Sequence, residues 1–143
     1  MSTTSWTFTR LLHSTAHAWR LAVDRHLKES GLSMSAWLAI ATLENAEHPL
    51  TQTALAQLLG LEDASVVPLI DRLVKQQLVT RVQPPEDRRK RLLVLTEQGK
   101  EAFLRVKAEA DALRARLLED VDPEALKVTE GVLGQMLKRL DTL

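Results

Sequence analysis

Residues 51–96 constrain the fold more than any other part of the chain, because two short helical patterns are followed there by two strand-like runs. Thr51 is placed to cap the first helix with its hydroxyl group, and Gly60 ends that helix and lets the chain turn. The second helix is expected over about residues 63–77. This order predicts a helix-turn-helix. Small and apolar positions at helical spacing would hold the two helices together: Ala54, Leu55, Ala56, Leu58, Val66 and Leu69.

A strongly basic hairpin is predicted after the second helix. Residues 78–82 and 92–95 are apolar runs typical of β-strands, and the segment PPEDRRKR between them starts with proline and is rich in cations. Residues 72–91 hold seven basic and two acidic residues, whereas the whole chain has 19 of each kind. A run of charge alone is usually only a solvated face. Its place between two strands, beside a helix-turn-helix, indicates a wing that contacts nucleic acid.

The wing and the segment after it carry a motif. An Asp-x-Arg pair is followed by a Leu-Thr-x-x-Gly helix start, supplied here by Asp87, Arg89, Leu95, Thr96 and Gly99. In this motif and in its flanking segments the chain resembles the MarR/SlyA family of bacterial winged-helix regulators over nearly its whole length. The resemblance implies a mainly α fold with a small two-stranded β-wing, a winged helix-turn-helix and long N- and C-terminal dimerisation helices. It also implies a transcription regulator that binds double-stranded DNA.

The segment before the helix-turn-helix is predicted to form two helices. Residues 5–30 have apolar positions three or four apart, and Gly31 ends this pattern. Ser33 or Ser35 caps the next helix, which stops before Pro49 because a residue preceding proline avoids helical geometry. The buried side of this helix is expected to carry Trp37, Leu38, Ile40, Ala41 and Leu43.

Two long helices are expected after the wing. Thr96 caps the first, whose apolar seam is narrow as in a coiled coil, and Asp122 with the proline after it begins the second. Apolar helices at both ends of a small chain need a partner, and a second copy of the chain is the commonest one. We therefore predict a homodimer. Residues 1–32 and 97–143 would form the dimerisation region, and residues 33–96 the DNA-binding domain, of a single interlocked unit.

Composition limits the class of function. A length of 143 residues, with 45% hydrophobic and 27% charged residues, suits one helical domain with its own core. No apolar run approaches the roughly 18 residues that span a bilayer, and the N-terminus has no signal pattern, so a cytoplasmic location is expected. The absence of cysteine excludes disulfides and thiolate chemistry. Because catalytic signatures are missing too, the sequence predicts a protein that is not an enzyme and needs no cofactor.

The predicted recognition helix departs from the family pattern. Pro68 stands where relatives often carry a polar or basic contact residue, and it cannot donate to the carbonyl four residues earlier. Either the helix begins near Ser65, which leaves Pro68 in the first turn, or it is locally distorted. Ser65 is expected to face base edges. Glu62 and Asp63 favour the helix dipole but repel phosphate, so we expect fewer base contacts here and greater reliance on the wing.

The remaining DNA contacts are assigned from residue type and position. Arg72 and Lys75 are candidates for backbone phosphates. In the wing, the resemblance implies that Asp87 orients Arg89 by a charge-assisted bond, and that Arg88 or Arg89 reaches the minor groove. As a structural element this pair is an exposed turn contact worth less than about 1 kcal/mol. The full predicted DNA-binding set is Thr51, Gln52, Ser65, Val66, Pro68, Arg72, Lys75, Asp87, Arg88, Arg89 and Arg91, so that Val66 stands both here and among the packing residues.

Two histidines of the first helix are candidates for ligand binding. His13 and His17 lie one helical turn apart, a spacing that can bind zinc, but two ligands are too few and no metal site is predicted. Trp37, Trp19 and Met34 are first of all core residues, yet at the junction of the dimer helices and the winged module they can also line an apolar cavity. The resemblance implies that aromatic or phenolic acids bind there. His13, His17 and Trp37 are assigned to that role.

These predictions favour a homodimeric, ligand-responsive transcription regulator. In this interpretation the protein is a repressor that leaves a pseudo-palindromic operator when a small effector binds. The alternative is a winged-helix protein that binds DNA broadly as an architectural factor. Selective, salt-dependent binding to one site over random DNA would distinguish the two.

Overall fold

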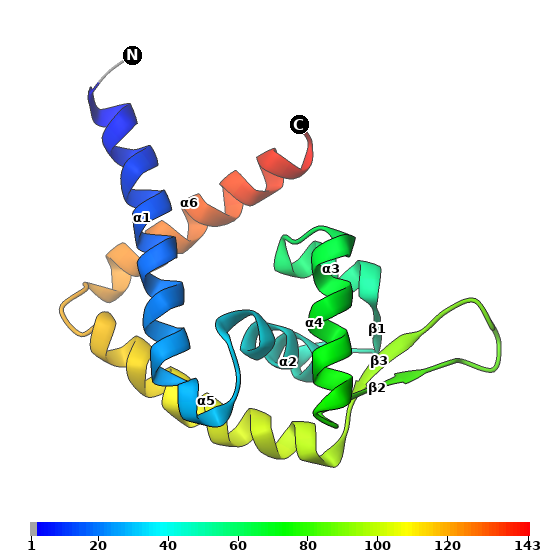
Figure 1. Ribbon diagram of the computed structural model, residues 1–143. Helices are drawn as coiled ribbons and strands as arrows, with labels where there is room; N and C mark the ends of the chain where they lie inside the picture. The colour runs from blue at the N-terminus through cyan, green and yellow to red at the C-terminus, as the bar shows by residue number, and fades with distance from the viewer. Residues whose placement is uncertain (1–2) are drawn as a thin grey trace. The chain divides into compact units, whose positions relative to one another are not determined.

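The computed structural model describes residues 3–143, with side chains from Trp6 onward, and consists of helices and one small sheet (Figure 1). The chain divides into two compact units, one reaching to Asp111 and the other formed by Ala112–Leu143. The mainly helical, winged-helix fold class expected from the sequence is confirmed. In chain order the elements are α1 (Thr3–His26), a short 3-10 helix η1 (Lys28–Ser30), α2 (Met34–Asn45), β1 (Leu50–Thr51), α3 (Gln52–Leu59), α4 (Asp63–Lys75), β2 (Val79–Val82), β3 (Leu92–Leu95), α5 (Glu97–Leu117) and α6 (Pro123–Asp141).

Polar contacts fix the start of α2. The Ser33 hydroxyl accepts a hydrogen bond from the Ala36 N–H at 3.1 Å, so Ser33 and not Ser35 caps the helix. The Asp24 carboxylate of α1 accepts a second bond, at 2.5 Å, from the first amide of α2. These two acceptors satisfy helix N–H groups that have no partner within the helix. The beginning of α2 is thereby tied to α1.

Two expectations for the first helices are wrong in detail. The helix expected over residues 5–30 ends at His26, and η1 follows before Gly31 turns the chain with a φ of 78°. Leu38, expected on the buried side of α2, is exposed. The positions that α2 buries are Ala36, Ala39 and Ile40. Two of these three buried residues of α2 are alanines, and such small side chains let α2 pack closely against the neighbouring helices α1 and α3.

The helix-turn-helix is built as predicted. The Thr51 hydroxyl accepts a hydrogen bond from the Ala54 N–H at 3.1 Å and caps α3, and Gly60 ends α3 with a φ of 68°. Leu58, expected in the core, is 65% exposed. Among the described residues no single helix is long and apolar enough to cross a bilayer; only α3 and α4 taken together would be, and they are bent by 111°. The shared core of the two helices consists of Leu55, Ala56, Val66, Leu69 and Ile70.

The wing is part of an antiparallel sheet with strand order β1-β3-β2. The β2–β3 hairpin was predicted, with Val79 opposite Leu95 at its base. The third strand, β1, pairs Leu50 with Leu93 and was not predicted, because two residues are too short to show a strand pattern. Because α3 follows β1 directly, this pairing ties the hairpin to the start of α3, and the far end of the hairpin projects from the sheet as the wing (Figure 1).

The junction between the wing and α5 is tightly packed. Thr96 caps α5 as predicted, because its hydroxyl accepts a hydrogen bond from the Gly99 N–H at 3.0 Å. The same hydroxyl donates to the Gln77 carbonyl at 2.6 Å, and Gln77 itself has a φ of 64°. A Cβ atom at Gly99 would overlap the Leu78 carbonyl oxygen. Only glycine therefore lets α5 approach the turn between α4 and β2 this closely.

The unit Ala112–Leu143 leaves most of its apolar side chains exposed. Pro123 occupies the first position of α6, but the Asp122 side chain makes no capping bond in the described structure, contrary to expectation. None of the described side chains of α6 is buried. An amphipathic helix of this kind presents an apolar surface suited to a partner. The exposed large apolar residues of this unit are Leu117, Val121, Val128, Val132, Leu133, Leu137, Leu140 and Leu143.

Candidate nucleic-acid interface

Helix α4 is amphipathic: one side packs against the core and the opposite side is exposed to solvent. Its buried positions recur three and four residues apart and are Val66, Leu69, Ile70 and Leu73. On the outward side, Ala64, Val67 and Pro68 are exposed in the first two turns. Asp71 and Lys75 continue this side toward the end of the helix, and both are exposed. A partner that meets α4 would first contact hydrocarbon and then charged groups.

One prediction for α4 is wrong. Val66 has no exposed surface, so it belongs to the core and cannot contact DNA. The helix begins at Asp63, as the expected range of residues 63–77 had it, with Glu62 as its N-cap residue, and this excludes the alternative start near Ser65. Pro68 therefore lies beyond the first turn, yet α4 continues through it to its end. Because proline has no N–H, the carbonyl four positions earlier receives no bond from it.

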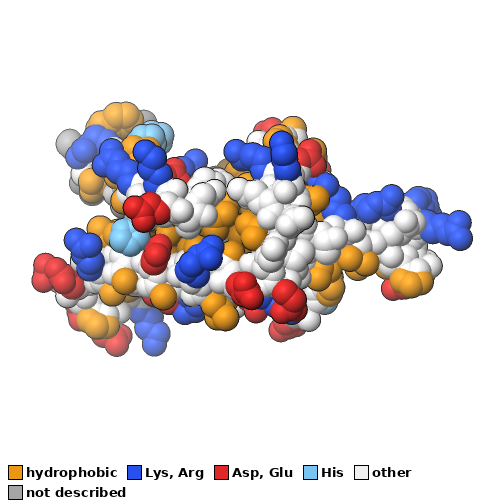
Figure 2. All heavy atoms as spheres, turned by 60° about the horizontal axis from the view of Figure 1, so that its bottom comes forward, with side chains coloured by type: hydrophobic (Ala, Val, Ile, Leu, Met, Phe, Trp, Pro, Cys, Tyr) orange, Lys and Arg blue, Asp and Glu red, His pale blue; other side chains and the backbone are white. Residues whose placement is uncertain are grey.

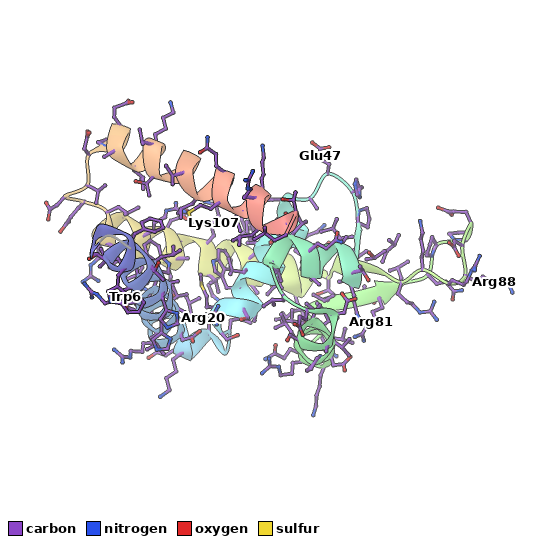
Figure 3. All side chains as sticks on the ribbon, turned by 90° about the horizontal axis from the view of Figure 1, so that it is seen from above. Trp6, Arg20, Glu47, Arg81, Arg88 and Lys107 are labelled. Atoms are coloured by element: carbon purple, nitrogen blue, oxygen red, sulfur yellow. The ribbon has the colours of Figure 1, made fainter. Side chains whose placement is uncertain are left out.

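Arg81 connects the wing to both helices of the helix-turn-helix. Its Nη2 lies 2.5 Å from the Asp71 Oδ1 of α4, and its Nε donates to the Gln52 Oε1 of α3 at 3.0 Å. The Arg81 side chain is 29% exposed and that of Asp71 58% exposed. In Figure 3 Arg81 lies where the base of the wing meets α4. The pair neutralises a carboxylate on the outward side of the recognition helix.

A basic cleft lies between the start of α3 and the wing. It encloses about 500 Å³ and takes its walls from three separate segments of the chain. Four of its side chains are cations and three can form neutral hydrogen bonds, which is a composition suited to phosphate oxygens. The residues that line it are Thr51, Gln52, Thr53, Arg81, Arg89, Lys90 and Arg91.

The wing loop is held by bonds to its backbone. Asp87 Oδ1 accepts a hydrogen bond from the Arg89 backbone N–H at 3.0 Å, whereas the Arg89 Nε lies 3.9 Å away. Asp87 therefore fixes the backbone at Arg89 and forms no hydrogen bond with its guanidinium. The sequence had predicted a charge-assisted bond to the guanidinium itself. Gln83 Nε2 donates to the Arg88 carbonyl at 2.8 Å and fixes the other side of the loop.

The cations of the wing are open to solvent. The Arg89 side chain is 96% exposed, and Arg88, Lys90 and Arg91 are exposed as well. Figure 2 shows Lys and Arg side chains gathered toward the end of the projecting wing. Exposed cations on a fixed loop are accessible to a polyanion, and the Arg91 guanidinium is at the same time held by the Arg88 and Lys90 carbonyls. Residues 88–91 thus place four consecutive cations on the surface of the wing.

The predicted DNA-binding residues fall into three groups in the structure. Thr51 and Gln52 come together with Arg89 and Arg91 in the basic cleft. Asp87 and Arg88 belong to the wing loop but do not line this cleft, and the remaining exposed residues are on α4, apart from it. Ser65 lies in the first turn of α4, Lys75 in the last, and Arg72 on a flank beside Gly31 and Ser33.

Comparison with known proteins identifies this arrangement. A family model of the MarR family matches residues 30–90, and the solved transcriptional regulator PA3341 is 34% identical, with a TM-score of 0.85 over 95% of this chain and 99% of that chain. The chain belongs to the MarR family. AbsC of Streptomyces coelicolor, a MarR family regulator, has the same fold, with a TM-score of 0.90 at 22% identity over 100% of this chain and 98% of its own. CouR of Rhodococcus jostii RHA1, solved with p-coumaroyl-CoA bound, is 26% identical, with a TM-score of 0.82 over 89% of each chain.

As a member of the MarR family, the protein is a DNA-binding winged-helix protein of transcription regulation. These relatives are regulators and not enzymes. Sequence reasoning missed Thr53, Arg81 and Lys90 in the cleft, and Ala64 and Val67 on α4. The basic run signalled Arg81 and Lys90, but the partners of Arg81 lie on other elements and have no local signature. Ala64 and Val67 have no distinguishing feature in the sequence, and only the structure shows that they face outward.

The predicted ligand residues of this MarR family member are divided between two places. His13 and His17 line a cleft of about 440 Å³ on α1, together with Thr9, Leu12, Ala16 and Arg20. Trp37 does not line it; the Trp37 ring stacks on that of Phe103, with centroids 5.6 Å apart. Among the described residues no group of three or more His, Asp or Glu could hold a metal ion.

Proposed function

We propose that this MarR family protein is a homodimeric, ligand-responsive repressor that reads a pseudo-palindromic operator. The observation that carries the proposal is the basic cleft, in which Arg89 and Arg91 of the wing meet Thr51 and Gln52 at the start of α3. A phosphate seated there would hold α4 against the major groove and the wing tip against the neighbouring minor groove. Base contacts and backbone contacts would then come from adjacent parts of one module.

Dimerisation is proposed to join the helices outside the winged module. The supporting observation is the exposed apolar side of α6, which includes Leu133, Leu137 and Leu140. A two-fold copy of the chain would cover this side with the same surface of its partner. We retain residues 1–32 and 97–143 as the dimerisation region and residues 33–96 as the DNA-binding domain. A dimer of winged modules requires two half-sites.

The effector is proposed to be a small aromatic or phenolic acid. The α1 cleft combines an apolar wall with His13, His17 and Arg20, which are groups that can hold a carboxylate. CouR, which binds an acyl-CoA of a phenolic acid, is similar to the chain over most of its length. Binding is proposed to change the distance between the two recognition helices and so release the operator. Trp37 stays a predicted ligand residue, although it stands apart from this cleft.

Two experiments test the proposal. Footprinting on the DNA upstream of the protein's own gene should show two protected half-sites whose centres are about 10 base pairs apart, which is one helical turn. Inserting five base pairs between them should abolish tight binding, because it rotates one half-site to the other side of the duplex. A protein that binds random DNA as tightly, or tolerates the insertion, would be the architectural factor of the alternative hypothesis. We also propose that the protein is located in the cytoplasm and has no enzymatic activity.

A further inference from the structure

The outward side of the recognition helix is chemically unusual in its first two turns. Ala64, Val67 and Pro68 are all exposed there, and the Val67 side chain is 42% exposed. Each offers only hydrocarbon, and Pro68 has no backbone N–H to donate. In a winged helix this part of the helix enters the major groove. A duplex bound in this way would meet these three apolar groups at the level of its base edges.

The polar groups that usually discriminate bases are missing from this region. Arginine and lysine read guanine in pairs of hydrogen bonds, and asparagine and glutamine read adenine. The sequence of α4, DASVVPLIDRLVK, contains no asparagine or glutamine, and its arginine, Arg72, lies on the flank beside Gly31. The carboxylate of Asp71 is paired with Arg81. Near the first turn the hydrogen-bonding side chains are Ser65, Asp63 and the N-cap residue Glu62, and the two carboxylates repel phosphate.

One base edge in the major groove is recognised by hydrocarbon, namely the C5-methyl group of thymine. We infer that Ala64, Val67 and Pro68 form an apolar reading surface for thymine methyl groups, with one or two thymines read in each half-site. The inference deepens the proposed function and rests on it, since it names what the recognition helix reads.

The surroundings of this surface favour DNA over a protein partner. Lys75 continues the same side of α4, and the exposed cations of residues 88–91 lie on the adjoining wing. A duplex would satisfy these cations with phosphates while the apolar surface meets the bases between them. A protein partner would have to supply matching acidic groups on both sides of an apolar patch. Lys75 and the four cations of residues 88–91 outnumber the exposed carboxylates of Glu62 and Asp63, and this balance of charge favours duplex DNA.

The test removes single methyl groups from the DNA. Each thymine of a footprinted half-site is replaced in turn by deoxyuridine, which keeps every hydrogen-bonding group of the base. Replacement of a thymine that is read should weaken binding about fourfold, the equivalent of roughly 0.8 kcal/mol for one buried carbon. The same replacement in both half-sites should weaken it about sixteenfold. Thymines outside the reading surface should show no change.

Protein variants link the methyl groups to α4. Val67→Ala should itself weaken binding and should abolish the deoxyuridine effect at the thymine that Val67 contacts. Leu38→Ala is the matched control, because Leu38 is also exposed, by 39%, but lies on α2 and belongs neither to the outward side of α4 nor to the basic cleft. The control should keep full sensitivity to deoxyuridine. Val67 is exposed and alanine favours helix, so loss of folding does not complicate the comparison.

The outcomes separate the two proposals. Selective operator binding that tolerates every deoxyuridine replacement would overturn the thymine inference and leave the repressor proposal standing. Unchanged deoxyuridine sensitivity in Val67→Ala would also overturn it, and would point to a protein partner as the use of the exposed patch. Failure to select any DNA site would overturn both proposals.

Discussion

The guanidinium of Arg81 lies 2.5 Å from the carboxylate of Asp71 and joins strand β2 of the wing to the outward side of helix α4. A second bond, to Gln52, extends the connection to α3. The wing, α4 and α3 are thus connected to one another through a single side chain, in addition to their direct packing. The same side chain lines the basic cleft, where it adds positive charge.

We predict that Arg81→Met weakens DNA binding more than it weakens folding. The pair is partly exposed, so its loss should lower the free energy of unfolding by less than about 1 kcal/mol. Operator affinity should fall roughly tenfold, because the Asp71 carboxylate is left unpaired beside the DNA and the cleft loses a cation. Urea unfolding and binding isotherms measure the two effects. Asp71→Asn is the control: it breaks the ion pair but removes the repulsive charge, and should retain affinity. Wild-type affinity in Arg81→Met would contradict the proposed role.

We predict that Arg89→Ala flattens the salt dependence of operator binding. Loss of one cation that contacts the DNA backbone should lower the slope of log K against log salt by about one. Asp87→Ala should cause part of the same loss in affinity, because the Arg89 amide loses its acceptor and the loop loosens. The measurement is a series of isotherms on operator DNA at several salt concentrations. Lys127→Ala, an exposed cation of α6, should leave the slope unchanged. An Arg89→Ala variant with the wild-type slope would remove that residue from the interface.

We predict that Gly99→Ala is strongly destabilising for its size. The added Cβ would overlap the Leu78 carbonyl oxygen, which is backbone and cannot rotate away. Overpacking of this kind costs about 1–3 kcal/mol, and urea unfolding would measure it. Gly134→Ala is the control, because a Cβ there meets nothing within 4 Å among the described residues, and alanine favours the helix. It should be neutral or stabilising by up to about 1 kcal/mol. Equal stability of the two variants would disprove the close approach.

We predict that truncation before Val132 abolishes dimerisation. The deletion removes Leu133, Leu137 and Leu140, each worth roughly 2–5 kcal/mol on large-to-small replacement if the partner buries it. Light scattering of the intact chain at micromolar concentration should show a dimer, and the truncated chain should be monomeric. Removing only Leu143 serves as the control, since this last residue lies beyond the end of α6. A stable, folded monomer of the intact chain would refute the proposed interface.

Features that depend on residues close together in the sequence could be predicted, whereas features that depend on residues brought together only by folding could not. The caps formed by Thr51 and Thr96 need only an amide three residues later, so residue type and spacing were sufficient. Arg81 and Asp71 are ten residues apart and on different elements, and nothing local marks them as partners.

The errors on the recognition helix have a common physical cause. A helix turns about 100° per residue, so its outward side is known only when its rotation in the core is known. Composition alone could not decide whether Val66 faced the core or DNA, and the structure buries it completely. The same rotation brings Ala64 and Val67 outward, and both were overlooked. The sequence also left open whether Pro68 stood in the first turn of a helix that starts near Ser65, and the observed start at Asp63 excludes this.

The exposed cations of the wing have a kinetic consequence because the chain as a whole carries a formal net charge of zero. A protein of zero net charge with a localised positive region is only weakly attracted to a polyanion at a distance. The electric field of the polyanion nevertheless rotates the protein until its positive region faces the polyanion. Diffusional encounters would therefore be selected by orientation, with the wing leading, before any base is contacted. Added salt screens the charges and shortens the distance over which the field can orient the protein. It should slow the arrival of the protein at its site before it shortens the time the protein stays there.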